Sequence, residues 1–555
     1  MICRRTPVII TVSKTAVFQD SGGKHMNRYL YCNGNILTMD EEKERVSAVL
    51  TDGERIAAVG DYEELLASSD GAEVIDLGGK TLMPAFIDGH SHLAETGIDA
   101  SRCDLTGSCS FDEILERILK FREKNHLTHG EVILCRGYDQ NQLKEQAHPV
   151  AAVLDAAGID NPVLCKHQSG HMLTANTKAM RVRGLSDDAV CLAGGMIGRD
   201  EKGFLTGYFE ENAMALISPY FFSPTDQEVE QAIINAQRIY LSHGITTIQD
   251  GSANTEQRIR IYEKLAAEGK LLADVVIYMS ANQGEELWNR VLARLGNRQY
   301  HDHLKIGGVK IFLDGSPQVR TAWMKRPYEG ENTYCGYPRC TDEYVEETVI
   351  KASRLGLQVL AHCNGDAAAA QFVTAVEKAA KLDPKVKLLR HEVVHLQTTA
   401  DEEIERMARL GMTATVFSGH VWYWGDVHMK NFGPIRGSRI SPIKKCIELQ
   451  IPANFHQDSP VTQPDMLHTI WCAVNRVTKS GKRIGPEYRI SVREALAAAT
   501  RIAAYPYFEE GKKGILRPGA RADMIILDQD PLTADPCEIR DIKVTAVIKD
   551  GTVVY

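Results

Sequence analysis

The sequence lacks the long apolar runs of a membrane protein, because no window holds 18 consecutive apolar residues. It also lacks an excess of basic residues: 64 Lys and Arg stand against 73 Asp and Glu, and the formal net charge is -9. Neither a nucleic acid nor an anionic membrane surface is therefore expected as a partner. Internal repeats and low-complexity segments are missing as well, which argues against a repeat protein.

Paired cysteine motifs are also absent. The 13 cysteines are odd in number and scattered, without the C-x-x-C pairs of a zinc ribbon or a redox motif. We interpret them as reduced thiols of a cytoplasmic protein, in preference to a disulfide framework. Near the N-terminus, Ser13 and Lys14 interrupt a short apolar run, which makes a poor signal peptide. We expect residues 1–25 to be a dispensable extension and synthesis to begin at Met26.

What is present is the composition of a globular protein, with 44% apolar and 25% charged residues in a chain of 555. Its central part alternates short apolar runs with amphipathic helical stretches, which predicts parallel strands joined by crossovers. The predicted strands are 82–87, 244–250, 273–278, 308–314, 358–362, 391–395, 412–416 and 452–458. Eight parallel strands predict an α/β fold, a (β/α)8 barrel of the TIM type.

Both ends of the chain read as short strands with turn signals. Asn33-Gly34 and Asp52-Gly53 interrupt the first end, and Asp550-Gly551 the second. We predict that the two ends pair into a small β-sandwich, with two unrelated β extensions as the alternative. The predicted domains are 26–84 and 506–555 for the halves of the sandwich and 85–505 for the barrel, which carries an insertion at about 93–240.

The histidines of the stretch His90-Ser91-His92 lie two residues apart after the first predicted strand. On an extended strand their side chains share one face, so both can reach one ion. Alone, such a pair is more often a solvated or core pair. Further candidate ligands fall at other strand ends, where barrel enzymes carry their catalytic groups: Lys310, His362, His395 and Asp458.

With these residues, the stretches 78–92, 309–316, 361–366 and 458–461 resemble the amidohydrolase superfamily of metal-dependent hydrolases, and most closely its amidohydrolase 3 (YtcJ-like) branch. The resemblance runs from about residue 29 to residue 555. It implies that His90, His92 and Asp458 hold the more buried metal. His362 and His395 would hold a second, and nitrogen and oxygen ligands suit one or two Zn²⁺ ions or a similar divalent metal.

The resemblance gives Lys310 the role of a carboxylated lysine that bridges both metals. An ordinary ammonium has no lone pair and cannot be a ligand. An ion-paired lysine at a strand end is the alternative interpretation. A single metal in place of two also stays open.

Further residues resemble pocket elements of that branch. We predict substrate contacts for His171, Asp139, Arg320, Trp323 and Trp422. Trp422 belongs to three consecutive aromatics on an expected loop after the seventh strand, where the branch usually has a Gln-Pro pair. Their apolar surface predicts a preference for amides that carry an apolar or aromatic group, with lid packing as the alternative. We interpret three further histidines as structural: His391, His420 and His456.

The sequence thus predicts a metal-dependent hydrolase of a carbon-nitrogen bond in a small non-peptide amide, N-acyl or N-formyl compound, acting through metal-activated hydroxide. Asp458 would carry the proton from the attacking water to the leaving amine, with ligation alone as the alternative. An ester, a lactone or a cyclic amide could use the same site. The alternative function is a non-catalytic regulatory or small-molecule-binding protein on the same barrel. A homodimer is the default expectation for the assembly.

Overall fold

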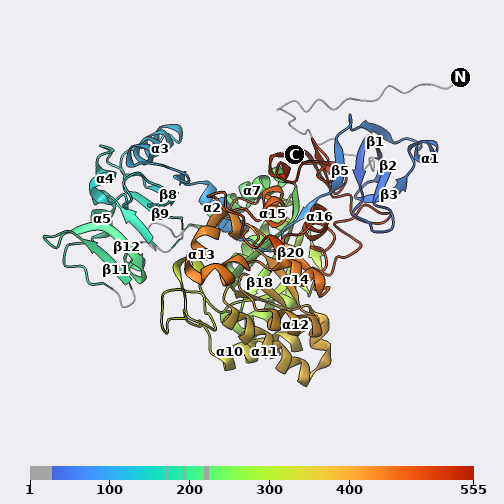
Figure 1. Cartoon of the computed structure of the whole chain (residues 1–555). Helices are drawn as coiled ribbons and strands as arrows, with labels where there is room; N and C mark the ends of the chain where they lie inside the picture. The colour runs from blue at the N-terminus through green and yellow to red at the C-terminus, as the bar shows by residue number, and fades with distance from the viewer. Residues whose placement is uncertain (1–27, 169, 171, 192–194, 218–223) are drawn as a thin grey trace. The chain divides into compact units, whose positions relative to one another are not determined.

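The computed structural model describes residues 28–168, 170, 172–191, 195–217 and 224–555 (Figure 1). The predicted extension 1–25 lies outside them. The chain divides into two compact units, one made of the residues up to 93 together with 237–555, and the other of residues 94–236. Among the described helices, none combines the length and hydropathy that a bilayer crossing needs.

The first unit contains a barrel of eight parallel strands. In hydrogen-bonded order they are β6 (Phe86–Ile87), β13 (Ile245–Asn254), β14 (Asp274–Ser280), β16 (Leu304–Phe312), β17 (Gln358–Cys363), β18 (Glu392–His395), β19 (Thr413–Val416) and β20 (Ala453–Phe455). The Gly89 N–H donates to the Phe455 carbonyl at 2.9 Å and so links the first strand to the last. A Cβ on Gly89 would lie 2.6 Å from that oxygen, so this approach requires glycine. The predicted series of eight strands is confirmed, except that the first is shorter than predicted: residues 82–84 belong to β5 (Thr81–Pro84), which pairs with the C-terminal strand β21 (Met524–Leu527) outside the barrel.

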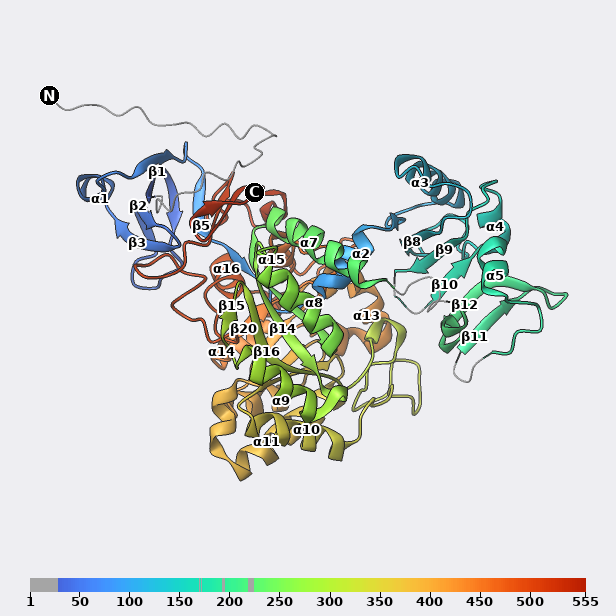
Figure 2. The ribbon, with the colours of Figure 1, turned by 180° about the vertical axis from the view of Figure 1, so that it is seen from behind.

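Helices surround these strands (Figures 1 and 2). They are α8 (Glu256–Ala267), α9 (Gly284–Leu295), α10 (Asp342–Arg354), α11 (Asp366–Leu382), α12 (Asp401–Arg409), α13 (His420–Ser438), α14 (Ile443–Glu448), α15 (Met466–Asn475) and α16 (Val492–Ala499). In α8, Ile259, Tyr262 and Leu265 are buried at helical spacing, and Thr255 caps the first turn by accepting from the Arg258 N–H.

The prediction of a loop after the seventh strand is wrong, because Trp422 and its two aromatic neighbours lie in the first turns of α13. That helix buries Val421, Gly425, His428 and Phe432, which recur every three or four residues. The three consecutive aromatic residues were interpreted as a loop, so this helical spacing was not recognised in the sequence. At Gly433, with φ 72°, the helical backbone is interrupted before Pro434.

The two chain ends form one mixed sheet in the same unit. Its strands are β1 (Arg28–Leu37), β2 (Arg45–Asp52), β3 (Arg55–Gly60), β4 (Glu73–Asp76), β5 (Thr81–Pro84), β21 (Met524–Leu527), β22 (Val544–Lys549) and β23 (Thr552–Val553). The ends meet where Met83 of β5 pairs antiparallel with Ile525 of β21. Ile36, Leu82 and Met524 pack into one core across this junction. The predicted pairing of the two ends is confirmed, and its description as a sandwich stays a prediction.

The second unit has its own six-stranded sheet, in the order β11 (Gly195–Arg199), β12 (Leu205–Glu211), β10 (Met172–Ala175), β9 (Val163–His167), β8 (Ile133–Tyr138) and β7 (Cys103–Asp104). The helices α3 (Phe111–Lys124), α4 (Ala151–Asp155) and α5 (Thr177–Arg183) accompany it, as Figure 2 shows. Ile114 and Ile118 of α3 pack on Ile133 and Cys135 of β8. The unit therefore has a hydrophobic core of its own.

Candidate metal centre

The six predicted metal ligands converge at the carboxyl ends of the barrel strands. His90 Nε2 lies 3.0 Å from Lys310 Nζ and 3.6 Å from Asp458 Oδ1. Asp458 Oδ1 also lies 3.1 Å from His92 Nε2. On the other side, His395 Nε2 lies 2.9 Å from His362 Nδ1, and the His395 and His90 ring centroids are 5.8 Å apart. Five different strands thus contribute to one cluster.

Two groups of possible ligand atoms share Asp458. In each group the atoms lie within 4.8 Å of one another: His90, His92 and Asp458 in the first, and His395, His456 and Asp458 in the second. His456, interpreted as structural from the sequence, therefore lies at ligand distance, with Nε2 3.0 Å from His395 Nδ1. The signal that could have found it is its spacing from Asp458, which repeats that of His90 and His92.

Hydrogen bonds on the side away from the cluster orient the imidazoles. His90 Nδ1 lies 2.6 Å from Gln249 Oε1, and the Gln249 amide donates to the Gly89 carbonyl at 2.6 Å. His92 Nδ1 lies 3.0 Å from Ser252 Oγ, and His456 Nδ1 lies 3.0 Å from Thr415 Oγ1. Because Gln249 Oε1 can only accept, the proton of His90 stays on Nδ1 and its Nε2 lone pair faces the cluster.

Gly251 provides the space that His90 occupies. A Cβ at this position would lie 2.1 Å from His90 Cε1 and 2.3 Å from Nδ1. Contacts under about 3 Å between such atoms force a shift of the neighbour. Glycine at position 251 is therefore a requirement for the observed placement of His90.

The electrostatics of the cluster suit metal binding. Burial and the adjacent Lys310 lower the pKa of His90 well below its usual range, and burial lowers the pKa of His362 and His456 to about 3. Burial acts to raise the pKa of Asp458, but the His92 hydrogen bond and the surrounding imidazoles hold it well below its usual range. Neutral imidazoles and a carboxylate offer lone pairs, so this donor set fits a divalent metal.

Lys310 is buried beside these donors, with 1% of its surface exposed. Burial lowers its pKa to about 8. Its Nζ contacts His90 Nε2, and it forms no ion pair with any carboxylate in the described part of the chain. The alternative interpretation as an ion-paired lysine therefore finds no partner among the described residues.

One side of the cluster is accessible. The side chains of His92, His362 and Asp458 are 20%, 16% and 15% exposed, whereas that of His90 is 1% exposed. Lys310 and His395 are buried as well. A reactant from solvent therefore meets Asp458 before it meets Lys310.

The predicted substrate residues lie at several places. Arg320 donates from Nε to Asn431 Oδ1 at 3.1 Å and from Nη1 to Glu331 Oε1 at 3.2 Å. The Trp422 ring packs edge-on against Trp471, with centroids 5.3 Å apart. Asp139 belongs to the second unit, where its Oδ1 lies 3.7 Å from His167 Nε2. His171 lies outside the described residues.

Trp323 is tied to the cluster through a buried carboxylate. Its backbone N–H donates to Asp314 Oδ2 at 3.0 Å, and Asp314 also accepts from the N–H groups of Asn364 and Gly365. Asp314 Oδ1 lies 3.5 Å from His362 Nε2. Burial raises the pKa of Asp314 to about 7. The Trp323 segment is thus anchored beside a predicted metal ligand.

Three polar residues beside His395, namely His420, His428 and Gln397, were not predicted to belong to the site. The His420 and His395 ring centroids are 6.4 Å apart, and His428 Nε2 lies 2.7 Å from Gln397 Nε2. The Nδ1 atoms of His420 and His428 are buried without a hydrogen-bond partner among the described residues. The sequence signal that could have indicated these residues is the lack of the branch's usual Gln-Pro pair after the seventh strand.

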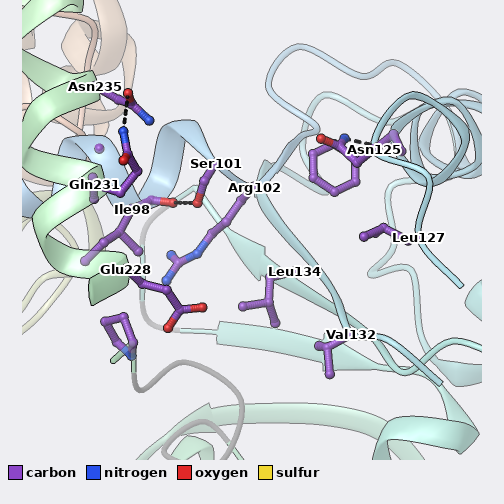
Figure 3. A pocket seen from close by; sticks show the side chains of 14 residues that line it. Ile98, Ser101, Arg102, Asn125, Leu127, Val132, Leu134, Glu228, Gln231 and Asn235 are labelled. Atoms are coloured by element: carbon purple, nitrogen blue, oxygen red, sulfur yellow. Dashed lines mark hydrogen bonds between the residues drawn. The ribbon is translucent and has the colours of Figure 1, made fainter. Parts of the chain in front are cut away.

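The second unit contains a cavity of about 410 Å³, all of whose lining residues fall within 94–236 (Figure 3). Ile98, Leu134 and Glu228 are among them, and Gln231 donates to Asn235 at 3.0 Å on one wall. None of the predicted site residues lines this cavity. The candidate chemistry therefore belongs to the barrel cluster.

Comparison with known proteins agrees with this geometry. A model described as "Amidohydrolase family" matches residues 73–555, and one described as "Imidazolonepropionase-like composite domain, bacteria" matches residues 48–72. An N-substituted formamide deformylase of Arthrobacter pascens is 26% identical, over 96% of this chain and 98% of its own. The Bacillus subtilis protein YtcJ is 28% identical, over 95% of this chain and 99% of its own.

A solved structure extends the likeness to three dimensions. It is an uncharacterised metal-dependent hydrolase from Pyrococcus horikoshii, 26% identical, with a TM-score of 0.76 over 92% of this chain and 99% of that one. The family model spans both the barrel and the C-terminal strands. The chain therefore belongs to the amidohydrolase family, with a TIM-type barrel, and is a metal-dependent hydrolase similar to YtcJ.

Proposed function

We propose that this hydrolase cleaves a carbon-nitrogen bond other than a peptide bond, in a small amide, N-acyl or N-formyl compound. The observation that carries the proposal is the Asp458 carboxylate, which is shared by two groups of imidazole ligands and is itself partly exposed. The relative named as an N-substituted formamide deformylase supports the choice of bond.

The proposed metal ligands are His90, His92 and Asp458 for one divalent ion, and His362 and His395 for a second. Lys310, carboxylated on Nζ, would bridge the two. Its contact with His90 Nε2 and its lack of an ion pair in the described chain support this role. Zn²⁺ suits this mixture of nitrogen and oxygen donors. His456 is a further donor within reach of the second position.

A divalent ion in this cluster supplies Lewis acidity: it polarises a carbonyl and lowers the pKa of a bound water from about 15.7 toward about 7. Asp458 takes the proton from the attacking water and passes it to the leaving nitrogen. Its partial exposure places it on the side that a substrate reaches first. Although burial acts to raise the pKa of Asp458, the surrounding imidazoles hold it well below its usual range, so Asp458 stays a carboxylate, the form that can accept a proton.

The proposed substrate contacts remain those of Arg320, Trp323, Trp422, Asp139 and His171. Trp323 is the best supported, because Asp314 anchors its backbone beside His362. The aromatic rings favour an amide with an apolar or aromatic substituent. A panel in which only highly charged amides react would contradict this preference.

The test is the metal content per chain, measured by inductively coupled plasma mass spectrometry, together with turnover of a panel of N-formyl and N-acyl amines. His90→Ala and His362→Ala are compared with the control His129→Ala, an exposed histidine of the second unit. About two equivalents, reduced in both ligand variants and unchanged in the control, support the two-metal site. Loss in His90→Ala alone indicates one metal. No metal and no turnover after reconstitution would favour the non-catalytic binding protein.

A further inference from the structure

A second cavity of about 410 Å³ lies at the amino ends of the barrel strands, within the first unit. The start of β16, the loop before it, the turn between β2 and β3 and the segment 508–521 enclose it. Its walls carry four carboxylates and six cations, which are Arg55, Arg298, Lys305, Lys512, Lys513 and Arg521. The chain has a net charge of -9, so this excess of two positive charges is local.

Half of these cations are neutralised by ion pairs. Lys305 pairs with Glu509, and Lys513 Nζ lies 2.7 Å from Glu509 Oε2 and 2.6 Å from Asp274 Oδ2. Arg521 Nη1 lies 2.7 Å from Glu54 Oε2. The charges of these three cations are neutralised within the protein. They line the cavity but leave little positive charge to attract a ligand.

The other three cations, Arg55, Arg298 and Lys512, form no ion pair with a described carboxylate. Arg298 is half-buried, with Nη2 donating to the Gly356 carbonyl at 3.1 Å and with Nε buried and lacking a hydrogen-bond partner in the described chain. Its guanidinium lies 3.5 Å from the Phe508 ring centroid, and that of Arg390 lies 4.1 Å from the same ring. Arg390 is itself paired with Glu510, whereas Arg298 has no carboxylate partner among the described residues, and a half-buried unpaired cation costs stability unless an anion joins it.

The pKa shifts of two lining cations are consistent with the excess of positive charge in the cavity. Burial, and then the neighbouring Lys513, lowers the pKa of Lys305 well below its usual range, and Lys512 and Arg298 act in the same direction. Burial and Arg390 likewise lower the pKa of Arg298. Burial is thus the main cause of both pKa shifts, and the neighbouring cations add to it.

We propose that this cavity is a binding site for a small, multiply charged oxyanion, such as the diphosphate or triphosphate group of a metabolite. Arg298 supplies a planar fork of donors and Lys512 and Arg55 supply charge at the rim. The side chains of Tyr300 and Phe508 give the remaining wall an aromatic character. An oxyanion here would contact both the mixed sheet formed by the two chain ends, through Arg55, and the barrel, through Arg298.

This site is separate from the metal cluster. Lys305 lines the cavity and Lys310 contacts His90, and both belong to β16 (Leu304–Phe312). Five residues of extended strand span roughly 17 Å, at about 3.3 Å per residue. A ligand in the cavity therefore cannot touch the metal ligands, and the proposal is independent of the reaction at the other end of the barrel.

The test is isothermal titration calorimetry of the metal-loaded protein with sodium pyrophosphate and with sodium tripolyphosphate, at an ionic strength fixed with NaCl. We expect saturable binding of one anion per chain and a rise in Tm of about 2 °C or more. Lys512→Gln and Arg298→Gln should each weaken binding about tenfold or more. The control Lys120→Gln, an exposed lysine of α3, should bind as the wild type does.

Two further arms keep the result interpretable. Pyrophosphate can also bind a catalytic metal, so the His90→Ala variant is titrated too and should retain the same affinity. If Arg298→Gln does not fold, Arg55→Gln replaces it, because Arg55 is exposed. Absence of saturable binding, loss of binding in His90→Ala, or equal weakening by Lys120→Gln would overturn the proposal.

Discussion

The Lys310 ammonium nitrogen lies 3.0 Å from His90 Nε2, and both side chains are 1% exposed. Two nitrogens of residues 220 positions apart thus face each other at the carboxyl ends of two barrel strands. An unmodified lysine can only donate in this contact, whereas a carboxylated one would place oxygen atoms among the imidazoles.

The first prediction concerns this pair. We expect Lys310→Ala to lower metal affinity by at least about 100-fold, the upper end of the range for residues that only support a ligand. Activity should fall in parallel, and part of it should return when a short carboxylic acid is added to fill the space. Metal content and turnover check this, with Lys378→Ala, an exposed lysine of α11, as the control.

The state of Lys310 can be observed directly. Intact-mass measurement of the native protein, or a crystal structure, should show the mass or the density of one added CO₂ at this residue. An unmodified Lys310 in fully active, metal-loaded protein would rule out the bridging role.

The second prediction separates proton transfer from ligation at Asp458. We expect Asp458→Asn to retain most of the metal, because an amide oxygen and the neighbouring imidazoles remain, and to lose about 10²–10⁴-fold in kcat. The control is Asp112→Asn, which removes a charge at a position that is 88% exposed. Loss of metal in step with activity would reduce Asp458 to a ligand, and full activity would remove both roles.

The third prediction uses a glycine that contacts His90. Gly251→Ala should displace the imidazole, because its Cβ would lie 2.1 Å from His90 Cε1. We expect metal affinity to fall about 10–100-fold while the fold is retained. Gly60→Ala is the matched control, since the atom nearest to a Cβ there is Lys43 Nζ at 3.7 Å. Equal metal content in both variants would show that His90 tolerates the shift.

The fourth prediction concerns stability at low pH. Asp274 Oδ2 lies 2.6 Å from Lys513 Nζ and 3.1 Å from Lys549 Nζ, and its Oδ1 lies 2.7 Å from His303 Nδ1. Burial acts to raise the pKa of Asp274, but these cations hold it well below its usual range. The folded pKa is thus below the unfolded value of about 3.9, so the stabilisation is complete above about pH 4 and is lost as pH falls further.

Replacing Asp274 by Asn removes the carboxylate that two buried lysines share, while Lys513 keeps Glu509 and Lys549 keeps Asp550, so the change should cost about 1.5–3 kcal/mol at pH 7. Thermal unfolding of the wild type and the variant from pH 7 to pH 3 measures the difference. We expect this difference to be constant down to about pH 4 and to shrink below it. A difference that stays the same at pH 3 would show that Asp274 does not carry this pH dependence.

The strand series of the barrel was predictable from local patterns. The apolar run 358–362 was predicted as a strand and is β17 (Gln358–Cys363), and 412–416 corresponds to β19 (Thr413–Val416). Buried parallel strands read as short continuous apolar runs, so the pattern alone identifies them. The convergence of His90 and Asp458 followed from the same count, because parallel strands in a barrel end on one face.

Residues that support the ligands were not predictable in the same way. Gln249 and Ser252 have no local motif, and their roles depend on contacts with His90 and His92 that are 159 and 160 positions away. The helix α13 was missed because its aromatic first turns suggested a loop. For Gln249 and Ser252 the deciding interaction lies between segments that are distant in the sequence, whereas the helical spacing of α13 is a local pattern.

The sequence by itself determined the order of the barrel strands and the positions of His90, His92 and Asp458 at strand ends, because both follow from local periodicity and spacing. Only the tertiary structure decided which nitrogen of His90 faces the cluster, that His456 joins it, and that Lys310 has no carboxylate partner among the described residues. These properties depend on burial and on side chains brought from distant strands, since both set the protonation of each ligand.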